Sequence, residues 1–453
     1  MQRLLMTRRS MLFSLVGLFM TTMLTIWGCG GGGSSYDDPA SATYTNQTAT
    51  ALIEPSTLKT WMDEGKVNAA ATNLNRVVIV AVGSAASYVD GHIPGARFLD
   101  SGTLNLTRTE GATQIGTMVM NGATIDANLQ RLGITKYTTI VLATSGTAAT
   151  DTAMNVARVY FTLRYWGFPK ERIKVLNGGE AAWKNAFDTA NPAWPATYDL
   201  ATDTPVVQPS TFSVRELYNG RDTNNFALRT SIGEMLSVVD GINSGALSTG
   251  ATGITILDER GGIDVNTEPY IANAQLSTTN VLDSHANYYG TVAGSFKDTA
   301  TLTAHLATFG VTASKSMNYV YCASGMRAST AFFVLDGILG WPVALYDGSW
   351  YQWSGYTSLA PSTNKVTVQW QTNVNTSGTA INRTANASFY VAPRPTTGAT
   401  DVHIGASLTL DGLGNTYEIT DPRANQILLE DKVHFTTPPT TTTVSAGGEG
   451  SGC

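Results

Sequence analysis

The chain has 453 residues, of which 43% are hydrophobic and only 14% are charged. This length allows two or three domains, and the hydrophobic content is enough for a sizeable core. The 28 basic and 34 acidic residues give a net charge of −6. Nucleic acid and anionic lipid surfaces attract basic proteins, so neither is expected as a partner.

Residues 1–28 are predicted to be a signal peptide. Three arginines precede the apolar run 11–27, which is too short to favour a transmembrane span. The segment ends before Cys29 and resembles a bacterial lipoprotein signal, in which Cys29 becomes the lipidated first residue. An uncleaved anchor is the alternative. Removing the segment leaves 25 basic and 34 acidic residues, a charge of −9.

The export route stays open, because residues 7–12 also resemble a twin-arginine signal. Gly30 after the cysteine resembles the signal for outer-membrane sorting. The protein is therefore expected in the cell envelope, held at the outer membrane by its lipid anchor and facing the periplasm or the cell surface. A protein partner in the envelope is possible, and the sequence does not identify it.

Residues 29–50 are rich in Gly, Ser, Thr and Asn, which predicts a flexible tether. A folded unit is then expected over residues 51–195. Its first helix is expected to start within Pro55–Asp63, with Ser56 or Thr57 as the cap. The other predicted elements are strands at Arg76–Val82, Thr139–Leu142 and Ile173–Leu176 and a helix at Thr152–Tyr165. Strands that alternate with helices predict a parallel α/β sheet.

Residues 211–362 repeat this plan after a Pro/Thr/Asp-rich linker at 196–210. The pairs that correspond are Thr230–Leu236 with the opening helix, Gly253–Leu257 with the first strand, Val320–Cys322 with Val141–Ala143, and Leu345–Trp350 with Leu176–Glu180. Self-similarity of this kind predicts two tandem domains of one α/β fold.

The most informative stretch is Tyr319–Thr330, which predicts a buried strand, a tight loop and a helix. Apolar residues three and four apart predict an amphipathic helix, and they are Ala328, Ala331, Phe332, Leu335, Ile338 and Leu339. Cys322 opens the loop and Arg327 closes it, while Gly325 allows a tight backbone. Backbone N–H groups and the helix dipole would then lower the pKa of the thiol and make it a nucleophile.

A lone cysteine at a strand end is often only a small buried hydrophobic residue. Here Ser324, Gly325 and Arg327 follow it and form an anion cradle, which an inert cysteine does not need. The sequence therefore favours a reactive thiol at Cys322.

Cys322–Arg327, followed by Ala-Ser, resembles the active-site loop of the rhodanese sulfurtransferases. Ile256–Arg260 resembles the Asp-x-Arg strand end of the same fold, and Tyr88–Ala96 resembles a rhodanese stretch in the first half. Four residues separate Cys322 from Arg327. The related phosphatases and arsenate reductases have one more, so the loop resembles the sulfur-transferring branch.

The resemblance implies a sulfurtransferase that moves sulfur from thiosulfate or a related donor, through a Cys322 persulfide, to a thiol or cyanide acceptor. The N–H groups of residues 323–327 and the Arg327 side chain would hold the anionic persulfide. The predicted substrate-binding residues are Ser324, Gly325, Met326, Arg327 and Arg260. Arg260 would either position an anionic donor or hold Asp258, and the resemblance favours the second role. No cofactor is implied.

The first copy lacks these groups. Ala143 and Ala148 stand for Cys322 and Arg327, and Ala81 and Gly83 stand for Asp258 and Arg260. It is therefore expected to be a catalytically inactive structural domain. The second copy also departs from the family, because Gly290–Ser295 lacks the expected His and Pro. A non-catalytic rhodanese-like scaffold of an envelope assembly is thus the alternative function.

An insert at 261–289 contains Tyr270, His285, Tyr288 and Tyr289. It covers the mouth of the active site or is a surface excursion without a role, and both interpretations are open. His285 is expected to be a solvated loop histidine. Five histidines and no paired cysteines indicate no metal site.

Alternating polar and apolar residues predict a small β appendage over 363–435, with strands at Lys365–Gln371, Ser388–Val391 and Ser407–Leu410. Residues 436–453 are expected to form a disordered tail. The tail ends at Cys453, a candidate redox thiol that would take sulfur from Cys322 or form a disulfide with it. An accidental cysteine is the alternative.

Overall fold

The computed structural model describes residues 44–110, 113–146, 150–187, 194–218, 224–243, 246–261, 271, 283–292, 294–357, 406–410, 415–419 and 425–437. The predicted signal peptide, Cys29, most of the tether and Cys453 lie outside these residues. Among the described helices, none combines the length and the apolar character needed to cross a bilayer.

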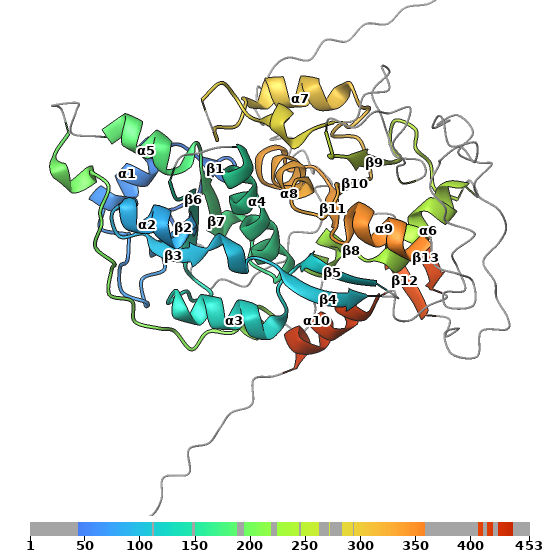
Figure 1. Cartoon of the computed structure of the whole chain (residues 1–453), viewed down its shortest axis with the longest axis horizontal. Coiled ribbons are helices and arrows are strands. Elements are labelled where there is room, and N and C mark those ends of the chain that lie inside the picture. The colour runs from blue at the N-terminus through green and yellow to red at the C-terminus, as the bar shows by residue number, and fades with distance from the viewer. Residues whose placement is uncertain are drawn as a thin grey trace, which may run out of the picture. The chain divides into compact units, whose positions relative to one another are not determined.

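The first lobe, residues 51–187, is built on a parallel sheet. The strands in spatial order are β1 (Leu52–Ile53), β7 (Ile173–Leu176), β6 (Thr139–Thr144), β2 (Val77–Gly83) and β3 (Arg97–Asp100). One face packs against α1 (Pro55–Asp63), α2 (Ala85–Asp90) and α5 (Gly179–Phe187). The other packs against α3 (Gly122–Arg131) and α4 (Thr150–Tyr165) (Figure 1). Every residue of β2 is buried, as expected for a strand covered on both faces.

The start of α1 corrects one prediction. The N-cap of α1 is Glu54, so neither Ser56 nor Thr57 caps this helix. Pro55 occupies the first helical position, where the missing N–H of proline costs nothing.

The second lobe, residues 229–357, has a sheet of the same kind. Its strands in spatial order are β8 (Arg229–Thr230), β11 (Val343–Tyr346), β10 (Met317–Tyr321) and β9 (Ile254–Asp258), all parallel. Its helices are α6 (Ile232–Asn243) and α9 (Ser349–Thr357) on one face and α7 (Thr299–Ala307) and α8 (Ala328–Phe332) on the other. The order β8-β11-β10-β9 of the second sheet corresponds to β1-β7-β6-β2 of the first sheet, which has β3 as a fifth strand at its edge. The predicted α/β fold with parallel sheets flanked by helices is confirmed.

The short helical turns are η1 (Ser101–Thr103), η2 (Lys170–Arg172), η3 (Ala196–Tyr198), η4 (Val214–Leu217), η5 (Asn224–Leu228) and η6 (His285–Tyr288). The segment that links the lobes makes contacts with the first one. Ala201 pairs with His92, and the N–H of Ser210 donates to the carbonyl of Gln130 at 3.0 Å.

The lobes share one hydrophobic core, because α4 packs against α8. The rings of Phe161 and Phe332 lie 5.0 Å apart. Helix α8 continues as the π-helical segment η7 (Phe333–Leu339). The helix predicted after the Cys322 loop is confirmed, but its amphipathic character is wrong, because residues 328–338 are all buried. The helix is covered by the first lobe on the side that would otherwise face solvent.

Buried ion pairs also join the lobes. The hairpin of β4 (Leu106–Glu110) and β5 (Thr113–Met118) brings Glu110 to Arg229 of the second lobe, with both Nη–Oε distances at 3.0 Å. Arg158 of α4 lies 2.7 Å from Asp347, and neither side chain is exposed. Pairs of this kind are costly to break, since one partner would be left as an isolated buried charge.

The C-terminal region is only partly the predicted β appendage. Strands β12 (Ala406–Leu410) and β13 (Asn415–Ile419) form an antiparallel hairpin, which confirms the strand predicted at Ser407. The strands predicted at Lys365 and Ser388 lie outside the described residues. Helix α10 (Gln426–Thr436) occupies the end of the appendage and corrects that prediction.

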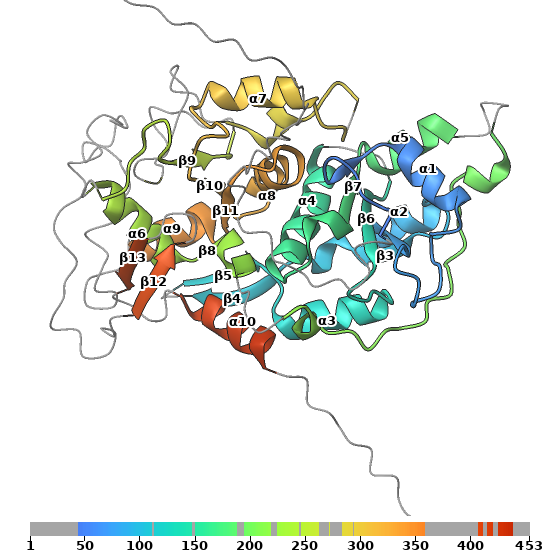
Figure 2. The same ribbon diagram turned by 180° about the vertical axis from the view of Figure 1, so that it is seen from behind.

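Helix α10 lies beside β4 in both views (Figures 1 and 2). Its buried Asp431 accepts two hydrogen bonds from Arg108, at 2.8 and 2.9 Å, and one from the Tyr165 hydroxyl at 2.9 Å. These contacts with distant residues fix the helix, and alternation within the segment does not reveal them.

Candidate active site: the Cys322 loop

Cys322 follows the last residue of β10, which lies between β9 and β11. Its side chain is buried, with 1% of its surface exposed. The backbone N–H of Cys322 donates to Ser349 Oγ at 3.1 Å, and its carbonyl accepts from the N–H of Trp350 at 3.0 Å. The first residues of α9 therefore fix the backbone on both sides of the sulfur.

The loop after Cys322 has the features of an anion cradle. Among the described residues, none accepts a hydrogen bond from the backbone N–H groups of residues 323–327. Gly325 has a φ of +84°, and a Cβ at this position would lie 2.5 Å from the Asp347 carbonyl oxygen. Only glycine fits there, as the sequence predicted, and the tight turn leaves several donors for an anion.

Arg327 closes the loop, but in a different way from the one predicted. Its side chain is exposed, and its Nη1 donates to the backbone carbonyl of Arg260 at 2.6 Å. This bond ties the Cys322 loop to the end of β9. A direct contact with a persulfide stays a prediction.

The first lobe also reaches the loop. Asn105, just before β4, donates from Nδ2 to the sulfur of Met326 at 3.2 Å. The Oδ1 of Asn105 accepts from Arg158 Nε at 2.8 Å. The predicted substrate-binding residue Met326 is therefore positioned by side chains of the other lobe.

Arg260 and Asp258 form a closed pair. Arg260 Nε lies 2.9 Å from both oxygens of Asp258, and Nη2 lies 2.6 Å from Oδ2. The Tyr321 hydroxyl donates to the same carboxylate at 2.5 Å. Burial lowers the pKa of Arg260, but Tyr321 and Asp258 outweigh it and hold this pKa above its usual value. Of the two roles predicted for Arg260, these contacts favour holding Asp258.

The insert packs against the core in the part that the structure describes. Tyr288 and Tyr289 are buried, and the Tyr289 hydroxyl lies 3.3 Å from Thr330 Oγ1 on α8. His285 is buried as well, so its prediction as a solvated histidine is wrong. These contacts favour a packed segment over a surface excursion at His285, Tyr288 and Tyr289, while Ala286 and Asn287 are exposed and Tyr270 lies outside the described residues.

Sequence reasoning missed two residues at this site. Ser349 has a φ of +51°, the left-handed region that side chains rarely adopt, and its Oγ orders Cys322. Glu259 is fully buried between Asp258 and Arg260, and its Oε1 lies 2.6 Å from the Tyr288 hydroxyl. The position of a charged residue directly after a buried strand could have indicated Glu259 as a site residue.

Strand pairing corrects the alignment of the two halves by one residue. Val320 pairs with Leu345, four residues before the start of α9. Leu142 pairs with Val175, four residues before the start of α5. The first-lobe counterpart of Cys322 is therefore Thr144 and not Ala143, while Ala148 lies outside the described residues. A hydroxyl replaces the thiol, so the first loop still offers no sulfur nucleophile.

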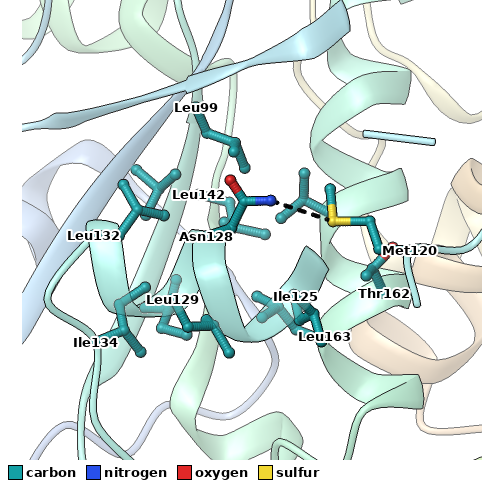
Figure 3. A pocket seen from close by; sticks show the side chains of 13 residues that line it. Leu99, Met120, Ile125, Asn128, Leu129, Leu132, Ile134, Leu142, Thr162 and Leu163 are labelled. Carbon is teal, nitrogen blue, oxygen red and sulfur yellow. Dashed lines mark hydrogen bonds between the residues drawn. The ribbon is translucent and has the colours of Figure 1, made fainter. Parts of the chain in front are cut away.

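A small pocket in the first lobe has a different character (Figure 3). Its lining is mainly aliphatic, and the Nδ2 of Asn128 donates to the sulfur of Met120 at 3.6 Å. The lining residues are Val80, Leu99, Met120, Ile125, Asn128, Leu129, Leu132, Ile134, Ile140, Leu142, Val159, Thr162 and Leu163. None of them is titratable or belongs to the Cys322 loop. Across the described residues, no cluster of His, Cys, Asp and Glu is arranged to hold a metal ion.

Comparisons with known proteins support the rhodanese family. A family model described as Rhodanese-like domain matches residues 55–186, which lie in the first lobe. The chain is 23% identical over 311 residues to thiosulfate sulfurtransferase YnjE of Escherichia coli (strain K12), covering 67% of this chain and 63% of that protein. It is 26% identical over 276 residues to putative thiosulfate sulfurtransferase SseB of Mycobacterium tuberculosis, covering 59% of this chain and 82% of that protein.

The fold is similar to the crystal structure of YnjE, with a TM-score of 0.50 and 18% identity. This match covers 68% of the present chain and 67% of the other. In sequence, the chain spans less than two thirds of YnjE. The comparisons thus support a rhodanese-like domain and an α/β fold, and the Cys322 loop lies outside the matched family segment.

Proposed function

We propose that this protein is a sulfurtransferase that carries sulfur on Cys322. The observation that carries the proposal is a buried cysteine at the end of a central parallel strand, followed by backbone N–H groups without acceptors among the described residues. Sulfurtransferase names among the relatives support the same reaction class. Thiosulfate or a related compound would be the donor, and a thiol or cyanide the acceptor.

Two transfers complete the proposed cycle. The Cys322 thiolate attacks the outer sulfur of thiosulfate, the sulfur–sulfur bond of the donor breaks, and sulfite leaves with the electron pair. The resulting persulfide anion would lie in the cradle of residues 323–327, where fixed N–H dipoles stabilise charge without reorganising. The acceptor then attacks the outer sulfur and releases the Cys322 thiolate.

We also propose that the lobes are tandem copies and that the first is not catalytic. The corresponding strand orders, β1-β7-β6-β2 in the first lobe and β8-β11-β10-β9 in the second, support this. So do two reciprocal contacts at corresponding positions, one just before α5, which follows β7, and one just before α9, which follows β11. Asn177 Oδ1 accepts from the N–H of Phe296 at 2.9 Å, and Asp347 Oδ2 accepts from the N–H of Val119 at 2.8 Å. We further propose that Cys29 is lipidated and that the lipid anchors the protein at the outer membrane.

Replacing the thiol tests the reaction. Cys322→Ser should abolish thiosulfate-to-cyanide transfer and leave the melting temperature unchanged, because the hydroxyl cannot hold a persulfide. Mass spectrometry after stoichiometric thiosulfate should find one added sulfur on the peptide with Cys322. Full activity of the variant would refute the assignment. A wild-type protein that takes no sulfur from thiosulfate or polysulfide would instead favour the non-catalytic scaffold.

A further inference from the structure

Glu259 and Cys322 are the first residues after the neighbouring strands β9 and β10, and they lie side by side. Asp258 pairs with Tyr321, so the next residues along β9 and β10 are Glu259 and Cys322. The N–H of Glu259 also donates to the Tyr321 carbonyl at 2.8 Å. Alternation directs these two side chains away from the face of Asp258, and neighbouring strands lie roughly 4.8 Å apart. A carboxyl group therefore stands next to the proposed sulfur carrier.

A chain of hydrogen bonds connects this carboxyl group with a partly exposed histidine. Glu259 Oε1 lies 2.6 Å from the Tyr288 hydroxyl, which lies 2.7 Å from Asp283 Oδ2. Asp283 Oδ1 lies 2.9 Å from Nε2 of His305 on α7. The His305 side chain is 23% exposed, so the chain runs from the buried site to solvent.

The chain needs a proton on one of its carboxyl groups. A single Tyr288 hydroxyl proton cannot serve two carboxylate oxygens, so one of the two acids must donate. Asp283 accepts from the N–H of Ser284 at 2.8 Å and from Asn287 Nδ2 at 2.9 Å, in addition to His305. Those donors favour ionised Asp283, and the proton therefore belongs on Glu259.

The surroundings of Glu259 agree with a neutral acid. Burial raises its pKa well above the usual value, and the nearby acidic groups Asp283, Asp258 and Cys322 raise it further, against a smaller opposing effect of the Tyr288 hydrogen bond. The guanidinium of Arg260 is bound to Asp258, with Tyr321 on the same carboxylate. The second oxygen of Glu259, Oε2, is buried without a hydrogen-bond partner among the described residues.

We propose that Glu259 gives its proton to the outer sulfur of the Cys322 persulfide as a thiolate acceptor attacks, and that Tyr288, Asp283 and His305 return a proton from solvent. The inference rests on the function proposed above. The acceptor sulfur bonds to the outer sulfur, the bond to Cys322 breaks, and its electron pair stays on Cys322. The released product is a protonated persulfide of the acceptor, and Glu259 is left ionised.

A proton shift along the chain then restores Glu259. The Tyr288 hydroxyl proton moves to Glu259, the Tyr288 oxygen takes a proton through Asp283 from the His305 imidazolium, and His305 takes one from water. Without this donor, an anionic acceptor would have to attack an anionic persulfide. Repulsion between like charges in a buried site would slow the attack.

The half-reactions separate this role from the proposed function. Cys322 is first loaded with thiosulfate, and sulfur uptake is measured by mass spectrometry. The loaded protein is then mixed with a thiol at fixed thiolate concentration over a range of pH. The wild-type discharge rate should fall as Glu259 ionises. Glu259→Gln should load normally but discharge roughly a hundredfold more slowly at low pH, with no pH dependence.

Glu234→Gln is the matched control. Glu234 is another buried glutamate on α6, which covers the sheet face opposite to α8, and its Oε2 accepts from the N–H of Ser231 at 2.8 Å. This control should keep the wild-type profile. A wild-type profile in Glu259→Gln would overturn the proposal. A wild-type protein that fails to load would instead refute the sulfurtransferase function itself, and with it this inference.

Tyr288→Phe tests the proton relay through Tyr288, Asp283 and His305. It also provides a test if Glu259→Gln does not fold. It leaves the Glu259 carboxyl in place but breaks the path to Asp283. The first discharge should stay fast, while steady-state turnover should slow and recover with small buffer acids. Steady-state turnover equal to wild type at low buffer concentration would overturn the relay.

Discussion

The two strand-end loops keep one backbone design and differ in their side chains. Gly179 in the first lobe and Ser349 in the second begin corresponding helices, with φ values of +54° and +51°. Ser349 uses its hydroxyl to hold the N–H of Cys322. At Gly179 a Cβ would lie 1.9 Å from Thr144 Oγ1, so the hydroxyl of Thr144 fills that space. The backbone is thus common to both lobes, and the side chains decide which loop can react.

The two loops also differ in whether their backbone N–H groups are free to bind an anion. In the first lobe, the N–H of Gly146 donates to Glu180 Oε1 at 3.2 Å, so the protein's own carboxyl group occupies the loop. Trp350 stands at the position of Glu180 in the second lobe, and its ring lies 4.8 Å from the Arg260 guanidinium. The second loop therefore keeps its N–H groups available, while the first has satisfied one of them internally.

The largest effect on stability and on sulfur uptake by the Cys322 loop is expected from Asp347→Asn. Asp347 Oδ1 lies 2.7 Å from Arg158 and Oδ2 lies 3.1 Å from Arg229, and the backbone carbonyl of Asp347 packs on Gly325. Removing the charge should cost roughly 3–5 kcal/mol of unfolding free energy, since both arginines stay buried. It should also slow sulfur uptake in the molecules that remain folded. Denaturant unfolding and single-turnover loading measure the two effects.

Asp336→Asn is the control for this substitution. Asp336 joins the lobes through Arg164 and Tyr160, at 2.8 and 2.7 Å, and these contacts do not involve the Cys322 loop. It should also destabilise the protein but leave sulfur uptake unchanged. Equal loss of uptake in both variants would mean that the first lobe supports the loop only through general stability.

Much of the fold followed from pattern. The apolar runs located β2, β6, β7, β9 and β10, and the repeated plan located the second sheet. The residue-by-residue alignment of the two lobes could not be predicted from the sequence. Val320–Cys322 matches Val141–Ala143 in hydrophobicity about as well as it matches the segment one residue later, and only the observed strand pairing decides between the two. The left-handed backbone of Ser349 and the burial of His285 depend on contacts between residues far apart in sequence.

A smaller effect is expected from Arg327→Ala. The side chain is exposed at the loop, where its positive charge would attract the proposed anionic donor. Its loss should slow thiosulfate transfer about ten- to a hundredfold, the equivalent of one charge-assisted contact. An uncharged donor such as a dialkyl trisulfide should be affected less, and Arg327→Lys should recover part of the rate. Equal losses with both donors would mean that Arg327 acts through its bond to the Arg260 carbonyl.

Glu180→Gln should change the pH dependence of stability. Burial raises the pKa of Glu180 from 4.5 to about 7, against smaller opposing effects of Gly146 and Lys184. The folded state then binds more protons than the unfolded state between these values, so this group costs stability as the pH rises through about 7. Glutamine keeps the hydrogen bond without the charge.

The variant should therefore be more stable than wild type by about 1–2 kcal/mol at alkaline pH, with the gain reduced by residual solvent screening. The two proteins should melt alike below the usual pKa of a glutamate. Melting temperatures measured across this range check the sign. A variant that is less stable than wild type at alkaline pH would mean that Glu180 is held as an anion.

The smallest effect is expected from giving the first loop a thiol. Thr144→Cys, made in a Cys322→Ser background, should take up no detectable sulfur from thiosulfate, because the Glu180 carboxyl group already holds the N–H of Gly146. A persulfide anion there would meet a like charge at alkaline pH and find one donor fewer at any pH. Adding Glu180→Ala removes the competing carboxyl group and should allow weak uptake, which mass spectrometry of the peptide around residue 144 detects. If Thr144→Cys, still with Glu180 in place, loaded as fast as Cys322 does in the wild-type protein, then the Glu180 carboxyl group would not be what prevents sulfur uptake by the first loop.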